Sequence, residues 1–340
     1  MGNKSTEKKI TRGIDEKFAE AFAKAFKGCE LYALYKKHKD ELFIGVRNNY
    51  LNLYYNCDSI AKVKYIQPKG EKGKRIVCEI DKYYIDDDNH YNSADKGKRF
   101  RIEPKEICAK YDAIKTKSDN KVKDNLEKKA QSKLVISNNN NEKSNWFCVD
   151  VEYIKQFEGD EEKEKTNFNG RFDIIAVSKE QSHRVALIEL KYGSGAFSGK
   201  SGIYKHIKDF IEFNREGFFE SHLKQEIVEI IKSQKDLGIS LPFEKLPQNV
   251  DLLKPEFYFI TLDNNAKENG STPKQSMSGY LFNDKRWECK RLSTKQRVET
   301  VFGDVTKEDN NPHIKFLFST AILENMEITD IIDDGKYDRE

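Results

Sequence analysis

Three residues near the middle of the chain have the types and spacing that could hydrolyse a phosphate ester: Asp173, Glu189 and Lys191. Two carboxylates supply the oxygen ligands that Mg²⁺ prefers, and this hard cation keeps several bound waters. A bound cation polarises a phosphoryl oxygen and acidifies a bound water. A neighbouring lysine can position that water and offset the charge that develops on the phosphate. The pattern predicts metal-dependent hydrolysis of phosphodiesters with Mg²⁺, or Mn²⁺ in its place.

Both parts of this pattern lie in short apolar segments that read as strands. Residues 171–177 (RFDIIAV) contain the aspartate, and residues 184–192 (RVALIELKY) contain the other two. Because side chains alternate along a strand, Glu189 and Lys191 point the same way as the apolar Leu187. Charges on a face that otherwise looks buried need a partner or a metal. The strand positions therefore favour a site over an ordinary surface hairpin, which is the competing interpretation.

The neighbouring segments alternate between strand and helix patterns. An apolar stretch at 146–157 carries Glu152, and a glycine-rich turn after residue 192 leads into a helix over 203–213. A second helix over 218–235 and an apolar strand over 257–262 follow. This order predicts an α/β core, in a chain that is α+β as a whole.

The string D-x15-E-x-K resembles the active-site motif of the PD-(D/E)xK nuclease superfamily, which includes many restriction, repair and defence-system nucleases. Asp173 matches the first acid, Glu189 the second and Lys191 the lysine. The resemblance covers about residues 146–265, and it departs from the pattern where Phe172 stands in place of the proline.

The resemblance implies a restriction-endonuclease-like mixed sheet flanked by helices, with the acids on adjacent strands of a central hairpin. It implies metal ligation by Asp173, Glu189 and the backbone carbonyl of Leu190. Members often add an acid from the preceding helix, and Glu152 is the candidate here. Polar residues on the helix after the E-x-K strand are accessory candidates, namely Lys205, His206 and Asp209.

The N-terminal residues 1–113 predict a separate small α+β domain. Phe18, Phe22 and Phe26 recur at helical spacing before Gly28, which is a plausible C-cap. A hairpin follows around Asn48-Asn49, and residues 60–66 and 75–80 are two more strand candidates. This domain is a candidate for substrate or partner binding.

The remaining boundaries follow from composition. Residues 114–145 are poor in large apolar side chains and contain four consecutive asparagines, which predicts a flexible linker. A nuclease-like domain over 146–330 and an acidic tail over 331–340 complete the division.

Charge and cysteine content exclude some classes of protein. The 60 basic and 57 acidic residues nearly balance, so net charge says little about partners, and the basic runs at 69–75 and 96–105 read as solvated surface. The six cysteines form no C-x-x-C pair, which argues against a structural zinc site. No apolar stretch approaches the roughly 18 residues of a membrane span or suggests a signal peptide, so a cytoplasmic protein without a membrane partner is expected.

The expected partner is nucleic acid, with DNA favoured over RNA. By analogy alone the setting is bacterial defence or a mobile element. A homodimer and a regulatory partner or ligand stay open.

Two other functions stay open. Residues Ser194–Ser201 nearly fit a phosphate-binding loop, which would make the chain an NTPase. The chain could also be a non-catalytic module that binds nucleic acid or protein on a nuclease-like scaffold. Tyr50, Tyr54 and Tyr55 could stack on bases, although cross-strand packing is the simpler interpretation.

Overall fold

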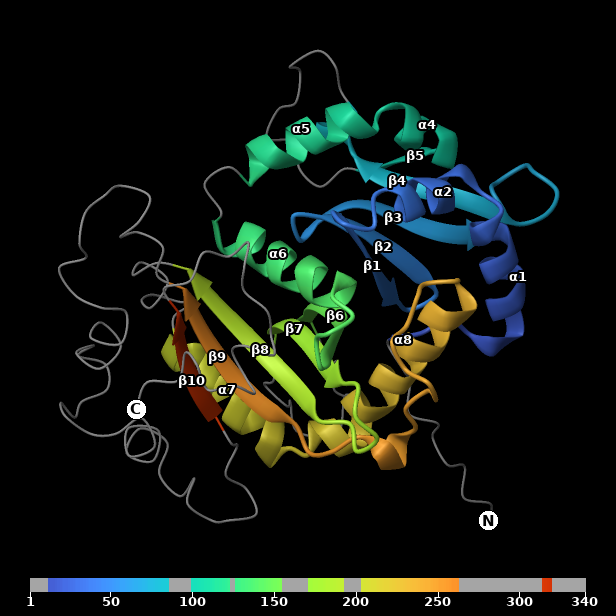
Figure 1. The fold of residues 1–340 in the computed structure, drawn as a ribbon. Coiled ribbons are helices and arrows are strands. Elements are labelled where there is room, and N and C mark those ends of the chain that lie inside the picture. The colour runs from blue at the N-terminus through green and yellow to red at the C-terminus, as the bar shows by residue number, and fades with distance from the viewer. Residues whose placement is uncertain are drawn as a thin grey trace, which may run out of the picture. The chain divides into compact units, whose positions relative to one another are not determined.

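The computed structural model describes residues 12–85, 99–122, 126–154, 171–192, 203–262 and 314–319 (Figure 1). The chain forms two compact units, each with its own sheet. The first comprises residues 1–124 and 220–250, and the second comprises residues 125–219 and 251–340. The predicted α+β class is confirmed.

The first unit contains a five-stranded antiparallel sheet in the order β1-β2-β3-β4-β5. Its strands are β1 (Leu42–Arg47), β2 (Tyr50–Tyr55), β3 (Asp58–Ile66), β4 (Arg75–Asp81) and β5 (Arg99–Ile102). Its helices are α1 (Glu16–Lys27), α2 (Glu30–Lys37), α3 (Lys82–Ile85), α4 (Pro104–Ala109), α5 (Tyr111–Lys121) and α8 (Lys224–Asp236).

Local sequence explains the start of this unit. The side chain of Asp15 caps α1 by accepting a hydrogen bond from the Lys17 amide, and Phe22 and Phe26 are buried on one side of the helix. The hairpin turns at Asn48-Asn49, where Asn49 has a φ of 61° and Arg47 pairs with Tyr50. Asparagine tolerates this left-handed conformation better than most residues. The predicted helix and hairpin are both present.

Helix α8 belongs to the first unit, whereas the sequence assigned it to the α/β core over 146–330. It contacts α1 and β1, and its Ile227, Ile230 and Ile231 are fully buried. The Ile14 amide donates a hydrogen bond to the Ser233 hydroxyl at 3.1 Å. Periodicity identifies an apolar helix face but says nothing about which sheet that face covers, so the error lay in the choice of partner.

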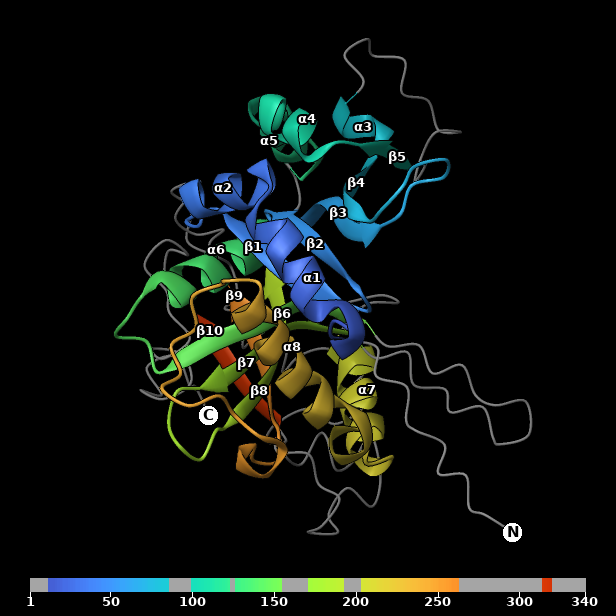
Figure 2. The ribbon, with the colours of Figure 1, turned by 90° about the vertical axis from the view of Figure 1, so that its right-hand side faces the viewer.

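The second unit contains a five-stranded mixed sheet in the order β10-β9-β8-β7-β6. Its strands are β6 (Trp146–Ile154), β7 (Arg171–Ser178), β8 (Val185–Tyr192), β9 (Glu256–Leu262) and β10 (Ile314–Ser319). The pairs β6–β7 and β7–β8 are antiparallel, and the pairs β8–β9 and β9–β10 are parallel. Helices α6 (Leu126–Asn140) and α7 (Ile203–Arg215) lie on opposite sides of this sheet (Figures 1 and 2).

The segment 114–145 differs from the expected flexible linker. It contains the end of α5 and the whole of α6, which packs on β6, β7 and β8. Asn138 and Asn139 use their side-chain amides to hold the start of β6, so the asparagine run serves the fold. Ala130, Leu134 and Val135 supply the buried face of α6. These apolar side chains are few, which is why composition suggested a linker.

Several predictions concern residues outside the described ranges. The glycine-rich turn with Ser194–Ser201 and the acidic tail over 331–340 are among them. Within the described ranges, no helix combines the length and the apolar character that crossing a membrane requires.

Candidate active site

The β7–β8 hairpin brings Asp173, Glu189 and Lys191 together. Ile174 pairs with Ile188, so Asp173 and Glu189 occupy the next step of the two strands. The carboxylate of Asp173 accepts a hydrogen bond from the Leu190 backbone amide at 2.9 Å, which fixes it against β8. The grouping that the sequence predicted is therefore a contact in the fold.

All three side chains are buried. Asp173, Glu189 and Lys191 are 4%, 1% and 4% exposed. Lys191 Nζ donates a hydrogen bond to Glu189 Oε1 at 2.6 Å. Glu189 Oε2 is buried, and no described residue donates a hydrogen bond to it. A buried carboxylate oxygen without a donor is costly, so it is a position where a cation or a water would be favourable.

Helix α7 supplies one of the three accessory residues to this cluster. His206 Nε2 lies 3.1 Å from Glu189 Oε1, and the imidazole ring packs near Phe259. Lys205 instead donates a hydrogen bond to Asp209 at 2.8 Å, one helical turn away. The Lys205 side chain is 49% exposed, so this pair contributes little to stability.

Helix α6 supplies an acid that sequence reasoning missed. Glu127 Oε1 lies 3.6 Å from Lys191 Nζ. The resemblance leads one to expect an acid from the preceding helix, but the segment 114–145 was interpreted as a linker. Recognising the helical spacing of Leu126, Ala130 and Leu134 would have been the available signal.

Glu152, the residue proposed for that helical acid, lies on strand β6. It forms an ion pair with Arg171, and Lys128 Nζ lies 3.8 Å from its Oε1. Its φ of 52° is unusual for a non-glycine residue in a strand. Arg171 Nε lies 3.9 Å from Asp173 Oδ1, so Arg171 connects Glu152 to the cluster. Arg171 is a second residue that the sequence analysis did not single out.

Burial dominates the protonation behaviour of the cluster. Burial raises the pKa of Glu189 well above its usual range, and the nearby charge of Asp173 raises it further. Burial also raises the pKa of Asp173, with Lys191 acting in the opposite direction. For Lys191, burial lowers the pKa, but the carboxylates of Glu189, Asp173 and Glu127 outweigh burial and hold the pKa above its usual value. Lys191 is therefore a cation at neutral pH. The two carboxyl groups beside it, Asp173 and Glu189, repel each other when both are ionised.

These properties fit a divalent cation in part. Among the described residues, no group of three or more His, Cys, Asp or Glu side chains is arranged to hold a metal. Mg²⁺ does not require one, because it binds through one or two carboxylates and keeps its waters. The unsatisfied Glu189 Oε2 and the mutual repulsion of Asp173 and Glu189 are what a cation would relieve. Asp173 and Glu189 are therefore the residues that fit the metal.

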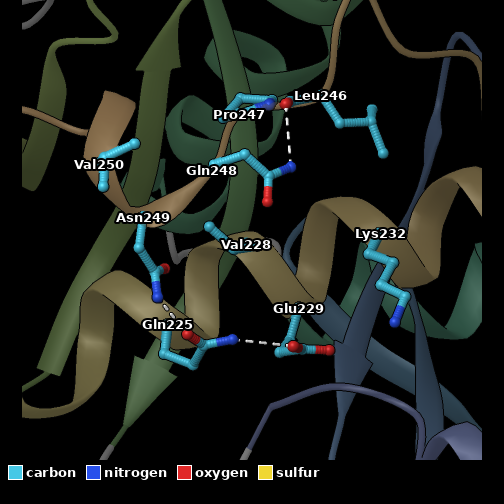
Figure 3. A pocket seen from close by; sticks show the side chains of 9 residues that line it. All are labelled: Gln225, Val228, Glu229, Lys232, Leu246, Pro247, Gln248, Asn249 and Val250. Carbon is cyan, nitrogen blue, oxygen red and sulfur yellow. Dashed lines mark hydrogen bonds between the residues drawn. The ribbon is translucent and has the colours of Figure 1, made fainter.

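A pocket of about 600 Å³ lies apart from this cluster, in the first unit (Figure 3). Helix α8 and residues 246–250 line it. Its polar side chains bind one another: Gln225 donates a hydrogen bond to Glu229 at 2.9 Å, and Asn249 donates one to Gln225. Its charged lining is limited to Glu229 and Lys232, so it offers no pairing of a nucleophile with a base.

Comparison of the chain with protein-family models, with curated proteins and with solved structures found no match.

Proposed function

We propose that this chain is a metal-dependent nuclease that hydrolyses phosphodiester bonds, with Asp173, Glu189 and Lys191 as its catalytic residues. One observation carries the proposal. Two carboxylates and an ammonium group are buried together at one step of a central hairpin, and one oxygen of Glu189 is left without a donor. Buried polar atoms are usually hydrogen-bonded, and functional sites collect buried groups with perturbed pKa values.

The surrounding residues hold these groups in place. The Leu190 amide fixes one oxygen of Asp173, and Lys191 and His206 both approach Oε1 of Glu189. Among the described residues, none donates a hydrogen bond to the other oxygen, Glu189 Oε2. The Lys191 ammonium group, held positive by the carboxylates, is suited to position water and to stabilise negative charge on a phosphoryl group.

Asp173 and Glu189 would hold Mg²⁺ or Mn²⁺, with the backbone carbonyl of Leu190 as a further oxygen ligand. When bound, the metal supplies Lewis-acid polarisation of the phosphate and acidifies a water. Glu152 and Glu127 would act indirectly, by holding the basic residues of the cluster in place. Glu152 pairs with Arg171, and Glu127 pairs with Lys191.

DNA is the first substrate to test, ahead of RNA, and a setting in bacterial defence or a mobile element rests on analogy. A homodimer and a restraining partner or ligand are parts of the same hypothesis. A cytoplasmic location is the corresponding expectation.

The test is incubation of the full chain with Mg²⁺ or Mn²⁺ and a panel of single- and double-stranded DNA and RNA. We expect cleavage that falls at least about a hundredfold in Glu189→Gln and in Lys191→Met, because each removes a group that acts on the developing charge. Glu256→Gln is the matched control. It neutralises a half-buried carboxylate in the same sheet, where Glu256 pairs with Arg184 at 2.7 Å, and it should cut at the rate of the unsubstituted chain.

Thermal unfolding gives a second readout that does not require cleavage. Metal at ten times its dissociation constant should stabilise the fold by roughly 1.4 kcal/mol, and Asp173→Asn with Glu189→Gln should remove that shift. If neither cleavage nor stabilisation by metal is observed, the proposal is wrong. The alternative interpretation, a non-catalytic module that binds nucleic acid or protein, would then be favoured. ATP hydrolysis that is lost in Lys200→Ala would favour the phosphate-binding loop instead.

A further inference from the structure

One face of the first unit's sheet gathers four basic side chains around a single glutamate. Lys62 on β3 pairs across the sheet with Glu79 on β4, and Glu79 pairs with Arg101 on β5. Residues directly opposite one another share a face, and so do residues two apart on one strand. Lys64 and Arg99 therefore project from this same face.

Glu79 neutralises only part of this charge. Lys64 Nζ lies 2.7 Å from Glu79 Oε2, and Arg101 Nε lies 3.7 Å from Glu79 Oε1. Among the described carboxylates, none forms an ion pair with Lys62 or Arg99. Asp81, opposite Arg99, is the other acid on this part of the face. The four basic side chains therefore outnumber the two carboxylates, Glu79 and Asp81.

Lys62 and Arg99, the two cations without an ion pair to a described carboxylate, repel each other. Burial lowers the pKa of Lys62, and repulsion from Arg99 and Lys64 lowers it further. Arg99 and Arg101 are exposed, while Lys62 and Lys64 are half-buried. An external anion would relieve this repulsion without requiring the face to rearrange.

We infer that this face, defined by Lys62, Lys64, Arg99 and Arg101, binds the phosphate backbone of nucleic acid. The inference rests on the proposed function for its choice of anion. The cations span three strands, roughly 10 Å across the sheet at the usual strand spacing, which is wide enough to meet more than one phosphate. Backbone contacts of this kind give affinity without sequence selectivity.

The aromatic residues nearby argue against base stacking as the binding mode. Lys62 Nζ already lies over the Tyr50 ring, 5.2 Å from its centre. Tyr54 is 5% exposed and Arg47 lies over its ring, while Lys115 lies over the ring of Tyr55. The tyrosines considered for stacking are thus engaged within the protein.

The apolar residues argue against a lipid surface. Membrane-binding faces place exposed apolar side chains beside their cations. Val77, opposite Lys64 on this face, is 3% exposed. Phe100 is 42% exposed, but it alternates with Arg99 and Arg101 and so belongs to the other face of β5.

The test uses the full chain with Glu189→Gln, without divalent metal, so that binding is measured apart from cleavage. Fluorescence anisotropy with labelled oligothymidylate and a labelled duplex gives the dissociation constant at a series of salt concentrations. Adding Lys62→Gln with Arg99→Gln should weaken binding at least about fivefold and reduce the salt slope by about 1 to 2.

Lys17→Gln with Lys24→Gln is the matched control, because it removes the same charge from the exposed side of α1. It should change the dissociation constant less than about twofold, since charge away from the contact is screened. Equal weakening by both pairs, or by neither, would overturn the inference. Equally tight binding of polyglutamate or of phosphatidylserine vesicles would also overturn the choice of nucleic acid. A chain that binds but does not cut would leave this surface standing and remove only the proposed catalysis.

Discussion

Some half-buried carboxylates in this protein are held by several donors at once. Glu41 in the first unit is an example outside the candidate active site. Lys115 Nζ and the Tyr111 hydroxyl donate hydrogen bonds to it, and His38 Nδ1 lies 2.7 Å away. Burial alone would raise the pKa of Glu41, but these donors outweigh burial and hold the pKa below its usual range. The pKa of Glu189 is raised instead, because Glu189 is more deeply buried and lies beside the charge of Asp173, and its donors do not outweigh these two effects.

This contrast predicts a pH-dependent contribution from Glu41. A carboxyl whose pKa is lower in the folded state stabilises the protein above its unfolded pKa, near 4.3, and the contribution is lost as pH falls through the folded value. Glu41→Gln should therefore lower the free energy of unfolding by about 1–3 kcal/mol at neutral pH and by much less in acid. Urea unfolding at the two pH values measures this difference. Glu20→Gln, at an exposed position, should show no such dependence; a loss for Glu41→Gln that is equal at both pH values would contradict the assignment.

At the scale of elements, the junction between α6 and β6 is built from side-chain amides. Asn138 is fully buried, donates a hydrogen bond to the Trp146 carbonyl at 2.9 Å and accepts one from the Ser144 hydroxyl at 2.6 Å. Asn139 both donates to the Cys148 carbonyl and accepts from the Cys148 amide, which extends the strand's hydrogen bonding to a side chain. These bonds fix the helix whose Glu127 pairs with Lys191.

The junction predicts unequal sensitivity along the asparagine run. Asn138→Ala leaves buried polar groups without a partner and should cost about 1–3 kcal/mol of unfolding free energy. Asn140→Ala, at an exposed position, should cost less than about 0.5 kcal/mol. Chemical denaturation of the two variants measures both values. Equal costs would mean that the segment behaves as the flexible linker that composition suggested.

At the scale of the whole molecule, the two units interleave along the chain. The chain leaves the first unit at residue 124, builds most of the second, returns at residue 220 to contribute α8, and goes back at residue 251. The first unit is therefore incomplete without a helix that follows the β7–β8 hairpin in sequence.

Because the units interleave, a substitution in α8 should destabilise the first unit and not the second. Ile230→Ala opens a cavity at a fully buried position and should cost about 2–5 kcal/mol. Hydrogen exchange should show faster exchange of β1 and α1 amides, which α8 contacts, and little change in β7. Ile175→Ala, fully buried on β7, should give the reverse pattern. Loss of protection confined to β7 in the Ile230 variant would contradict the assignment of α8 to the first unit.

The sequence by itself determined the elements whose patterns are local. The amphipathic helix with Phe22 and Phe26, the Asn48-Asn49 hairpin and the strands around Asp173 and Glu189 each follow from spacing and from turn residues. It also placed Glu189 and Lys191 on one face, because side chains alternate between the two faces of any extended strand. The catalytic role of these residues stays a prediction.

Only the tertiary structure decided which elements meet. Nothing local assigns α8 to the first sheet, turns the asparagine run into a helix junction, or brings Glu127 to the cluster of acids around Lys191. The basic run at 96–105 looked like solvated surface until the register of β3, β4 and β5 put Arg99 and Arg101 beside Lys62. Contacts between distant segments depend on how buried faces are matched across the whole fold, and a local pattern shows that a face is apolar or charged without showing what it meets.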